Sequence, residues 1–265
     1  STAGIYIYND YIYYASTSVK KDGEGNPKTG EMVVMRTKVD GTGTQTVAEF
    51  KDHSTPFRVV GNTLIYIREN KIVKINLAEK KFPETVIAES IGTTYFFTNG
   101  AKPSDNYLVY TVTEDKATVV KAVEIDGSNE PKTLLSNSMI GGNLTYTITL
   151  MKVVQRESGI SVFYKITDTS PNAPSLGIYY YNYDKNFSFT RANLVRLTQN
   201  DSTTVGLNYS DFYFINGRIF AVATKTVDSA TYSKIDILSE TGAFEEEAIA
   251  FKESVTVNSV YMTDD

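Results

Sequence analysis

The chain has 265 residues, of which 41% are hydrophobic and 22% charged, and it carries a net charge of −5 and no cysteine. This length and composition are those of a globular protein that buries its own core, and the missing cysteines exclude disulfides, thiolate metal sites and a cysteine nucleophile. Acidic and basic residues are mixed along the chain, and no apolar run approaches the roughly 18 residues of a membrane-spanning helix, so we expect no nucleic-acid partner and no membrane-spanning segment.

The first fifty residues consist of short apolar runs separated by turn residues. Asn9-Asp10 stands between IYIY and YIYYA, where residues that accept positive φ favour a tight hairpin turn. A later run, MVVMRTKV, ends at Asp40 in the turn sequence DGTG. The pattern predicts a four-stranded antiparallel meander over residues 5–50.

The segment 57–89 is the most compact copy of the same pattern. It reads FRVV-GN-TLIYIR-EN-KIVKINL, followed by a short polar stretch and PETVI. The runs are rich in Val, Ile and Tyr, which pack well on a pleated sheet, and Gly61-Asn62 and Glu69-Asn70 supply the turns. Four strands are therefore expected in about thirty residues.

Two markers repeat along the rest of the chain and define further units. A polar turn before an apolar run recurs at residues 10, 62, 106, 159, 217 and 258, and a strand-ending turn recurs in step with it at residues 40, 78, 126, 184 and 239. A period of about 40–50 residues is typical of propellers and other repeat arrays. The predicted units are 5–50, 57–89, 95–136, 150–198 and 212–251, and the four strands of each unit are lettered a to d in chain order. Residues 254–265 are predicted to be strands a and b of a partial sixth unit.

A four-stranded meander repeated in this way predicts an all-β fold, a β-propeller with five complete blades and part of a sixth. A pair of β-sandwiches is the rival arrangement, but it would not explain markers that recur in step. We expect residues 1–265 to form a single propeller domain, and the partial blade suggests a fragment of a ring of six to eight blades.

The IYYAS run and the later VVMRTKVDGTGTQTV run resemble the blades of TolB-like and related bacterial β-propellers of unknown function. The resemblance is strongest in the first three units, about half of the chain. It implies a propeller fold and an exported bacterial protein, but it describes a blade and implies no activity.

Two loops contain residues that could carry metal or acid–base chemistry. His53 is the only histidine, so it would have to serve alone in any zinc site or Ser-His-Asp triad, and we interpret it as a solvated loop residue. The loop 21–27 places oxygen-bearing side chains at alternate positions, but Pro27 stands where a calcium-binding loop needs glycine. A polar hairpin loop is the favoured interpretation.

Two further patterns recur in blade positions. The Tyr179–Tyr183 run could form a stacking platform for sugars, but its place in the repeat predicts a strand whose tyrosines alternate between the two faces and pack against neighbours. Asp40, Asp126 and Asp184 end corresponding strands, which favours Asx-turn roles over a catalytic cluster. Asn-x-Ser/Thr sequons at Asn143, Asn186, Asn200 and Asn208 matter only in a eukaryotic secretory pathway.

Loop lengths give the functional hint. The predicted insertions at 16–31, 169–176 and 227–230 all join strands b and c, and the long connectors 137–149 and 199–211 join strand d to the next strand a. These connections emerge at one end of each blade, whereas we expect the tight turns to join strands a and b at the other. Variable loops gathered on one face are typical of binding.

We therefore expect a non-enzymatic binding or scaffold propeller of an exported bacterial protein, which engages a protein or glycan partner through the b–c/d–a face. The alternative is a glycan-active lyase or hydrolase with its site in the central channel, and a third possibility is a structural module without a ligand. No residue is assigned a catalytic, cofactor-binding or metal-binding role, and no cofactor is expected.

Overall fold

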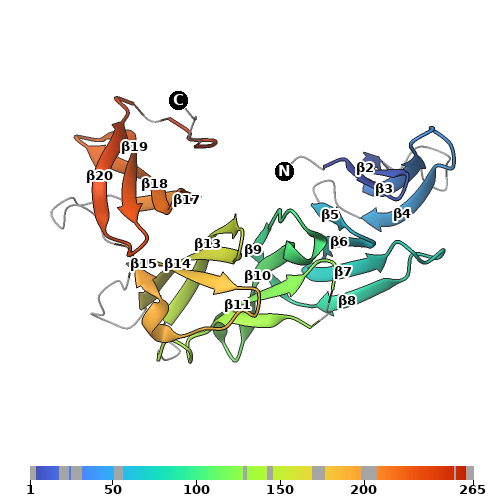
Figure 1. The fold of residues 1–265 in the computed structure, drawn as a ribbon, viewed down its shortest axis with the longest axis horizontal. Coiled ribbons are helices and arrows are strands. Elements are labelled where there is room, and N and C mark those ends of the chain that lie inside the picture. Colours follow the sequence, from blue (N-terminus) through green and yellow to red (C-terminus); the bar gives the residue numbers. More distant parts are fainter. Residues whose placement is uncertain are drawn as a thin grey trace. The chain divides into compact units, whose positions relative to one another are not determined.

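The computed structural model describes residues 4–17, 24, 32–50, 56–127, 130–141, 146–168, 177–197, 208–253 and 255–260. Within these ranges the chain forms twenty strands in five four-stranded sheets and two short 3₁₀-helices, η1 (Pro103–Asp105) and η2 (Arg191–Asn193) (Figure 1). Each sheet takes its strands in sequence order, as an antiparallel meander does. The all-β fold of propeller-type blades is thus confirmed, and we number the blades one to five and name their strands a to d in chain order.

The strands agree closely with the predicted units. The first blade contains β1 (Tyr6–Tyr8), β2 (Tyr11–Thr17), β3 (Met32–Lys38) and β4 (Gln45–Phe50), and the second contains β5 (Phe57–Val60), β6 (Thr63–Arg68), β7 (Lys71–Asn76) and β8 (Glu84–Ala88). The third contains β9 (Ile91–Phe97), β10 (Tyr107–Glu114), β11 (Ala117–Glu124) and β12 (Lys132–Leu135). The fourth contains β13 (Tyr146–Arg156), β14 (Gly159–Asp168), β15 (Gly177–Asp184) and β16 (Val195–Arg196), and the fifth contains β17 (Asn208–Ile215), β18 (Arg218–Val227), β19 (Ala230–Ser239) and β20 (Phe244–Ala250).

The chain divides into two compact units, and the boundary passes through the third blade. Unit one contains residues 1–113 and 121–132, and unit two contains residues 114–120 and 133–265. The single propeller domain expected from the sequence stays a prediction.

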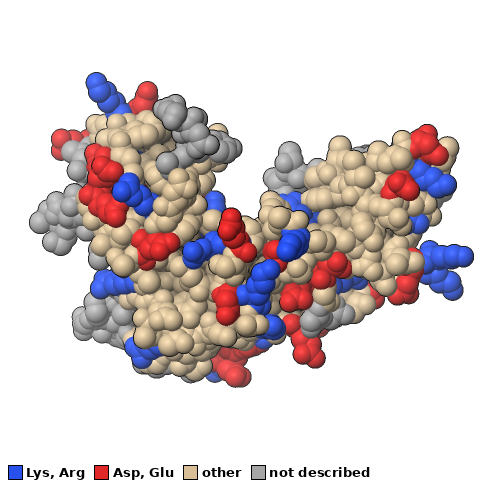
Figure 2. All heavy atoms as spheres, in the orientation of Figure 1, with Lys and Arg blue, Asp and Glu red and all other residues tan. Residues whose placement is uncertain are grey.

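Charged side chains of both signs are interspersed on one face of the molecule. On the face that Figure 2 shows, Lys and Arg lie among Asp and Glu over both units. None of the helices in the described residues has the length and hydropathy needed to cross a membrane.

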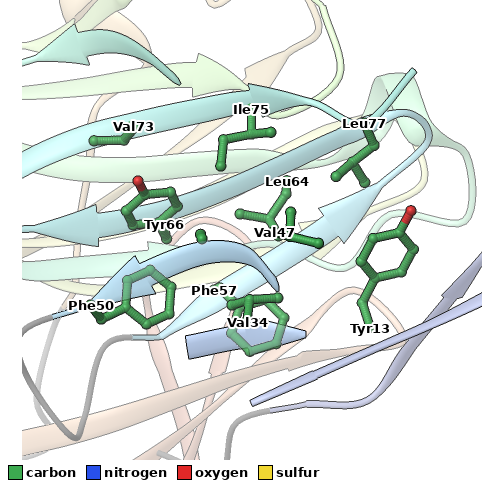
Figure 3. Close-up of a cluster of buried hydrophobic side chains, with 11 residues drawn as sticks. Tyr13, Val34, Val47, Phe50, Phe57, Leu64, Tyr66, Val73, Ile75 and Leu77 are labelled. Carbon is green, nitrogen blue, oxygen red and sulfur yellow. The ribbon is translucent and has the colours of Figure 1, made fainter. Parts of the chain in front are cut away.

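The first two blades share a core in unit one. Tyr6 pairs with Tyr13 across β1 and β2, and the tyrosines of this face pack toward the second blade. The ring of Phe50 from β4 lies 4.7 Å from that of Tyr66 in β6, and Tyr66 is fully buried (Figure 3). Burial of such a ring stabilises the fold by roughly 1.5–3 kcal/mol, so the contact between blades is a main source of stability.

The fourth and fifth blades share a second core in unit two. Phe163 of β14 lies between Tyr180 of β15, at 5.5 Å, and Phe212 of β17, at 4.3 Å between ring centroids. Leu197 and Ile219 are buried in the same cluster. Aromatic rings stacked across two sheets bury more apolar area than aliphatic side chains would, which explains the many tyrosines and phenylalanines of this chain.

The turns correct part of the expected loop pattern. The predicted b–c insertion at 227–230 is wrong, because Asp228 and Ser229 form a two-residue turn with φ values of 49° and 67°. Glu69-Asn70 and Asp115-Lys116 make equally tight b–c turns in the second and third blades, also with positive φ at both residues. Asp, Asn and Ser tolerate this left-handed backbone, and its twist matches that of the flanking strands.

The a–b connection of the third blade is correspondingly longer than expected. Residues 98–106 form a loop that contains η1. Asn106 stabilises this loop, because its Oδ1 accepts a hydrogen bond from the N–H of Gly100 and its Nδ2 donates one to the carbonyl of Gly100, each at 3.1 Å. The expectation that all a–b turns are tight is therefore wrong. At the other end of the chain, the strands predicted for a sixth blade are not found in residues 255–260, and Val255 instead bonds the hydroxyl of Ser233 in β19.

Candidate functional site

A pocket of about 170 Å³ lies at one end of the fourth blade, in unit two. Tyr146 is the first residue of β13, Ile166 lies near the end of β14, and Tyr179 lies near the start of β15. All three positions are at the b–c/d–a end of the sheet. The other residues that line the pocket are Ile140, Arg191 and Leu194.

The register of the sheet explains why these side chains meet. Tyr146 pairs with Asp168 and Ile148 with Ile166, so Tyr146 and Ile166 project from the same face. Tyr179 pairs with Tyr164 and lies two positions from Gly177, the partner of Ile166, which places it on that face as well. The pocket is thus built on three adjacent strands, and rigid strands position side chains more accurately than loops do.

Arg191 comes from the c–d connection that folds back along the fourth blade. It begins η2, and the carbonyl oxygen of Arg191 accepts a hydrogen bond from the N–H of Leu194, so both residues sit in one tight turn. A Cβ at Gly141 would lie only 2.5 Å from Nη1 of Arg191. Gly141 has a φ of 69°, and the missing side chain is what lets the guanidinium lie against the backbone there.

The pocket combines aliphatic walls with few polar groups. Ile140, Ile166 and Leu194 offer no hydrogen-bonding atoms, and the side-chain polar groups are the hydroxyls of Tyr146 and Tyr179 and the guanidinium of Arg191. Pockets for complete drug-sized ligands are about 300–1,000 Å³, whereas an apolar cavity of about 150 Å³ admits one ring. This pocket therefore has room for one ring-sized group of a ligand and is too small for a nucleotide cofactor.

The Tyr179–Tyr183 run divides between packing and the pocket. Tyr180 is buried against the fifth blade, and its hydroxyl donates to the carbonyl of Glu240. Tyr183 is buried on the opposite face and donates to the carbonyl of Leu134 at 2.7 Å. Burial raises the pKa of Tyr183 well above its ordinary value. The predicted alternation is present, but Tyr179 lines the pocket and is not core.

The three strand-ending aspartates have different partners. Asp40 accepts hydrogen bonds from the N–H and hydroxyl of Thr42, at 2.8 and 2.7 Å, and these bonds lower the pKa of its carboxyl. Asp184 accepts from the N–H of Asn186 at 3.0 Å, so both have the predicted Asx-turn role. Asp126 instead reaches the second blade, where it accepts from the hydroxyl of Thr63 at 3.0 Å.

A buried lysine lies close to Asp126 between the second and third blades of unit one. Lys74 of β7 is 5% exposed, and its ammonium donates to the carbonyl of Glu124. Removal from water lowers the pKa of Lys74 to about 8, against the opposing attraction of the Glu124 and Asp126 carboxylates. The group lies in a packed interface between blades, so a structural role follows.

A second buried polar network lies in the fifth blade. Asp236 is fully buried, accepts a hydrogen bond from the hydroxyl of Tyr209 at 2.9 Å and lies 2.9 Å from the ammonium of Lys234. Burial and the nearby carboxylate raise the pKa of Tyr209. Lys234 also lies 3.2 Å from Glu247, so its charge is compensated twice. The network joins strands β17, β19 and β20 and holds the sheet together.

Several predicted positions fall outside the described residues. They are His53, the loop 21–27 apart from Glu24, the loop 169–176, and the sequons at Asn143 and Asn200. Asn186 is exposed in a turn, and Asn208 begins β17. Among the residues that the structure describes, no three His, Asp or Glu side chains are grouped so that they could hold a metal ion.

Neither Tyr146 nor Arg191 was predicted as an individual site residue, although Tyr146 falls in the predicted connector 137–149. Arg191 lies in the connection 185–194, which is longer than the DGTG-type turn of the first blade, and that insertion was the available signal. Tyr146 was missed because strand a of this blade was predicted to begin only at residue 150, whereas β13 begins at Tyr146.

No known protein family matches the sequence, and no curated protein does. Among solved structures, the chain is similar to oligopeptidase B from Leishmania major, at 9% identity with a TM-score of 0.47, over 92% of this chain and 40% of that one. It is also similar to a quinoprotein alcohol dehydrogenase-like protein from Bacteroides thetaiotaomicron, at 11% identity with a TM-score of 0.38, over 92% of this chain and 64% of that one.

A third similar structure is the β-propeller domain of the trilobed protease from Pyrococcus furiosus, at 9% identity with a TM-score of 0.37, over 89% of this chain and 82% of that domain. The chain spans less than two thirds of the length of the first two proteins. At these identities nothing about activity carries over, and the blade architecture rests on the sheets themselves.

Proposed function

We propose that this chain is a non-enzymatic binding or scaffold module that engages a protein or glycan partner at the b–c/d–a end of its blades. The observation that supports the proposal is the pocket at that end of the fourth blade, lined by two tyrosines, an arginine and three aliphatic residues. A small pocket on a rigid sheet suits the capture of one group of a longer partner, since most of such a partner remains outside.

The proposal includes an exported bacterial protein of the TolB-like kind. Its support is the IYYAS run that begins at Ile12 and the DGTG turn at Asp40, the sequence features shared with those blades. Export predicts that the complete gene product from a bacterial source carries a leader that directs it out of the cytoplasm, and fractionation of the source cells tests this.

The isoleucine methyl groups provide a direct test of binding. Protein labelled at the isoleucine δ1 methyls is titrated with panels of short peptides and oligosaccharides, and we expect the methyl signals of Ile140 and Ile166 to shift. Ile7 is 73% exposed and lies in unit one, so its methyl signal serves as the control for nonspecific contact. The variant Leu194→Trp fills the pocket and should abolish the shifts.

Lys185→Ala is the matched control variant. Lys185 is an exposed residue of the fourth blade in its c–d turn, at the end of the sheet opposite the pocket. If partner binding survives Leu194→Trp and is lost with Lys185→Ala, the site lies at the other end of the blade and the proposal is wrong.

A further inference from the structure

We infer that the pocket of the fourth blade binds a carboxylate attached to one apolar group, and that its natural ligand is the carboxy-terminal residue of a peptide. This inference rests on the proposed binding function and specifies the ligand. It follows from three properties of the pocket, namely its charge, its walls and its size.

Among the residues whose side chains the structure describes, one charged residue lines the pocket, and it is a cation. That residue is Arg191. Its guanidinium has no hydrogen-bond or ion-pair partner among the residues that the structure describes, whereas Arg68, for comparison, makes an ion pair with Glu84 at 2.6 Å. A guanidinium presents two parallel N–H groups that match the two oxygens of a carboxylate, so a carboxylate is the anion that fits best.

Arg191 is an exposed residue, and its guanidinium lies beside the backbone of Gly141. It lies against Gly141, where any side chain would overlap it, and η2 fixes the backbone of Arg191 on the other side. The absence of a side chain at Gly141 thus leaves space for the guanidinium at this wall of the pocket.

The walls of the pocket favour an apolar group beside the carboxylate. The side chains of Ile140, Ile166 and Leu194 cannot accept or donate hydrogen bonds, and a sugar that entered would leave hydroxyls unpaired against them. Each buried hydroxyl without a partner costs about 1–3 kcal/mol, which counts against an acidic sugar. An aliphatic or aromatic side chain has no hydroxyl to leave unpaired, and its transfer from water into the pocket is favourable.

The size of the pocket favours a chain end. A volume of about 170 Å³ accommodates one side chain of ring size. An internal residue of a peptide would offer Arg191 an uncharged amide, whereas the last residue offers a carboxylate that is bonded directly to the Cα carrying its side chain. The same chemistry exists in a free apolar amino acid or an aromatic acid, and the experiment separates these sources from the peptide.

The test compares four probes by titration of the isoleucine methyl signals and by calorimetry. They are an N-acetylated tetrapeptide that ends in phenylalanine with a free carboxylate, the same peptide with a carboxy-terminal amide, benzoate, and a di-uronate. We expect the free-acid peptide to bind at least about tenfold more tightly than the amide, since a charge-assisted bond pair is worth about that factor or more. Benzoate should bind more weakly than the peptide.

Arg191→Gln should remove the preference for the acid over the amide while leaving weak binding of the apolar side chain. Arg196→Gln is the matched control, because Arg196 is an exposed arginine of the same blade that does not line the pocket. Each variant is first checked by thermal unfolding. If Arg191→Gln does not fold, Tyr146→Ala, which enlarges the pocket without changing its charge, should keep the acid preference and lower the affinity of both peptides.

The outcomes separate this inference from the proposed function. Equal binding of acid and amide, an acid preference that survives Arg191→Gln, tighter binding of benzoate than of the peptide, or binding of the di-uronate alone would each overturn the inference while leaving a binding pocket in place. If no peptide or oligosaccharide shifts the methyl signals of Ile140 and Ile166, the proposed function and the inference both fail.

Discussion

Lys74 gives the protein an unusual pH dependence of stability that can be calculated from the structure. The lysine is buried between the second and third blades of unit one, and its pKa is lowered to about 8 in the folded protein. In the unfolded chain a lysine titrates near 10.4. Between these two values the unfolded state binds more protons than the folded state, so the free energy of unfolding rises with pH.

The size of the effect follows from the two pKa values. Linkage gives a gain of about 2 kcal/mol in the free energy of unfolding between pH 7 and pH 9.5, most of it above pH 8. The buried tyrosines act in the opposite direction at higher pH. Burial raises the pKa values of Tyr66, Tyr183 and Tyr209, so the stability they confer is present below about pH 10 and is lost as the pH rises beyond it.

Urea unfolding at a series of pH values between 7 and 9.5 measures the slope. The wild-type chain should gain stability over this range, and Lys74→Met should flatten the curve because the variant has no ammonium to deprotonate. Lys71→Met is the control, since Lys71 belongs to the same strand but its side chain is 43% exposed and pairs with Glu89 at 2.8 Å. An unchanged slope in Lys74→Met, or a wild-type curve that falls between pH 8 and 9.5, would refute the reasoning.

Two further predictions concern stability and use urea unfolding at pH 7. Tyr209→Phe removes the hydroxyl that donates to the fully buried Asp236, and we expect the free energy of unfolding to fall by about 1–3 kcal/mol because a buried carboxylate oxygen loses its donor. A fall below about 0.5 kcal/mol would argue against the network. Gly61→Ala should lower the free energy of unfolding more than Gly41→Ala, although both glycines have positive φ, because a Cβ at Gly61 would lie 2.1 Å from the Asp126 carboxylate whereas Gly41 has open space. We expect a loss of about 1 kcal/mol at Gly41 and at least twice that at Gly61. Equal losses would contradict the close packing of the two blades.

The strands and the repeat could be predicted from the sequence because both depend on local signals. Alternating apolar residues, β-branched and aromatic side chains and residues that tolerate positive φ act within a few positions of one another. The second blade, from Phe57 to Ala88, agrees with its predicted bounds almost residue for residue. The same local chemistry was present at Asp228-Ser229, and the predicted insertion there was wrong because this turn signal was overlooked.

The loop lengths predicted only part of the candidate site, since Ile140 and Tyr146 fall in the predicted d–a connector 137–149 but the other lining residues do not. The elaborated b–c loops at 16–31 and 169–176 lie almost wholly outside the described residues, and tight b–c turns in the second, third and fifth blades correct the one-sided loop pattern. The pocket nevertheless lies at the expected end of a blade. It is lined mainly by residues of strands and of the connection that precedes β16.

The sequence by itself thus determined an all-β chain of propeller-type blades, with strand order and most turns in place, because these follow from contacts between near neighbours. Only the tertiary structure decided that Tyr180 and Tyr183 are buried while Tyr179 lines a pocket, and that Arg191 meets Gly141 there. It likewise decided that Lys74 is buried between two blades. Which side chains are buried and which residues come into contact depend on how segments that are distant in the sequence pack together. A repeated strand pattern does not show this, because it is the same whichever of its side chains are buried.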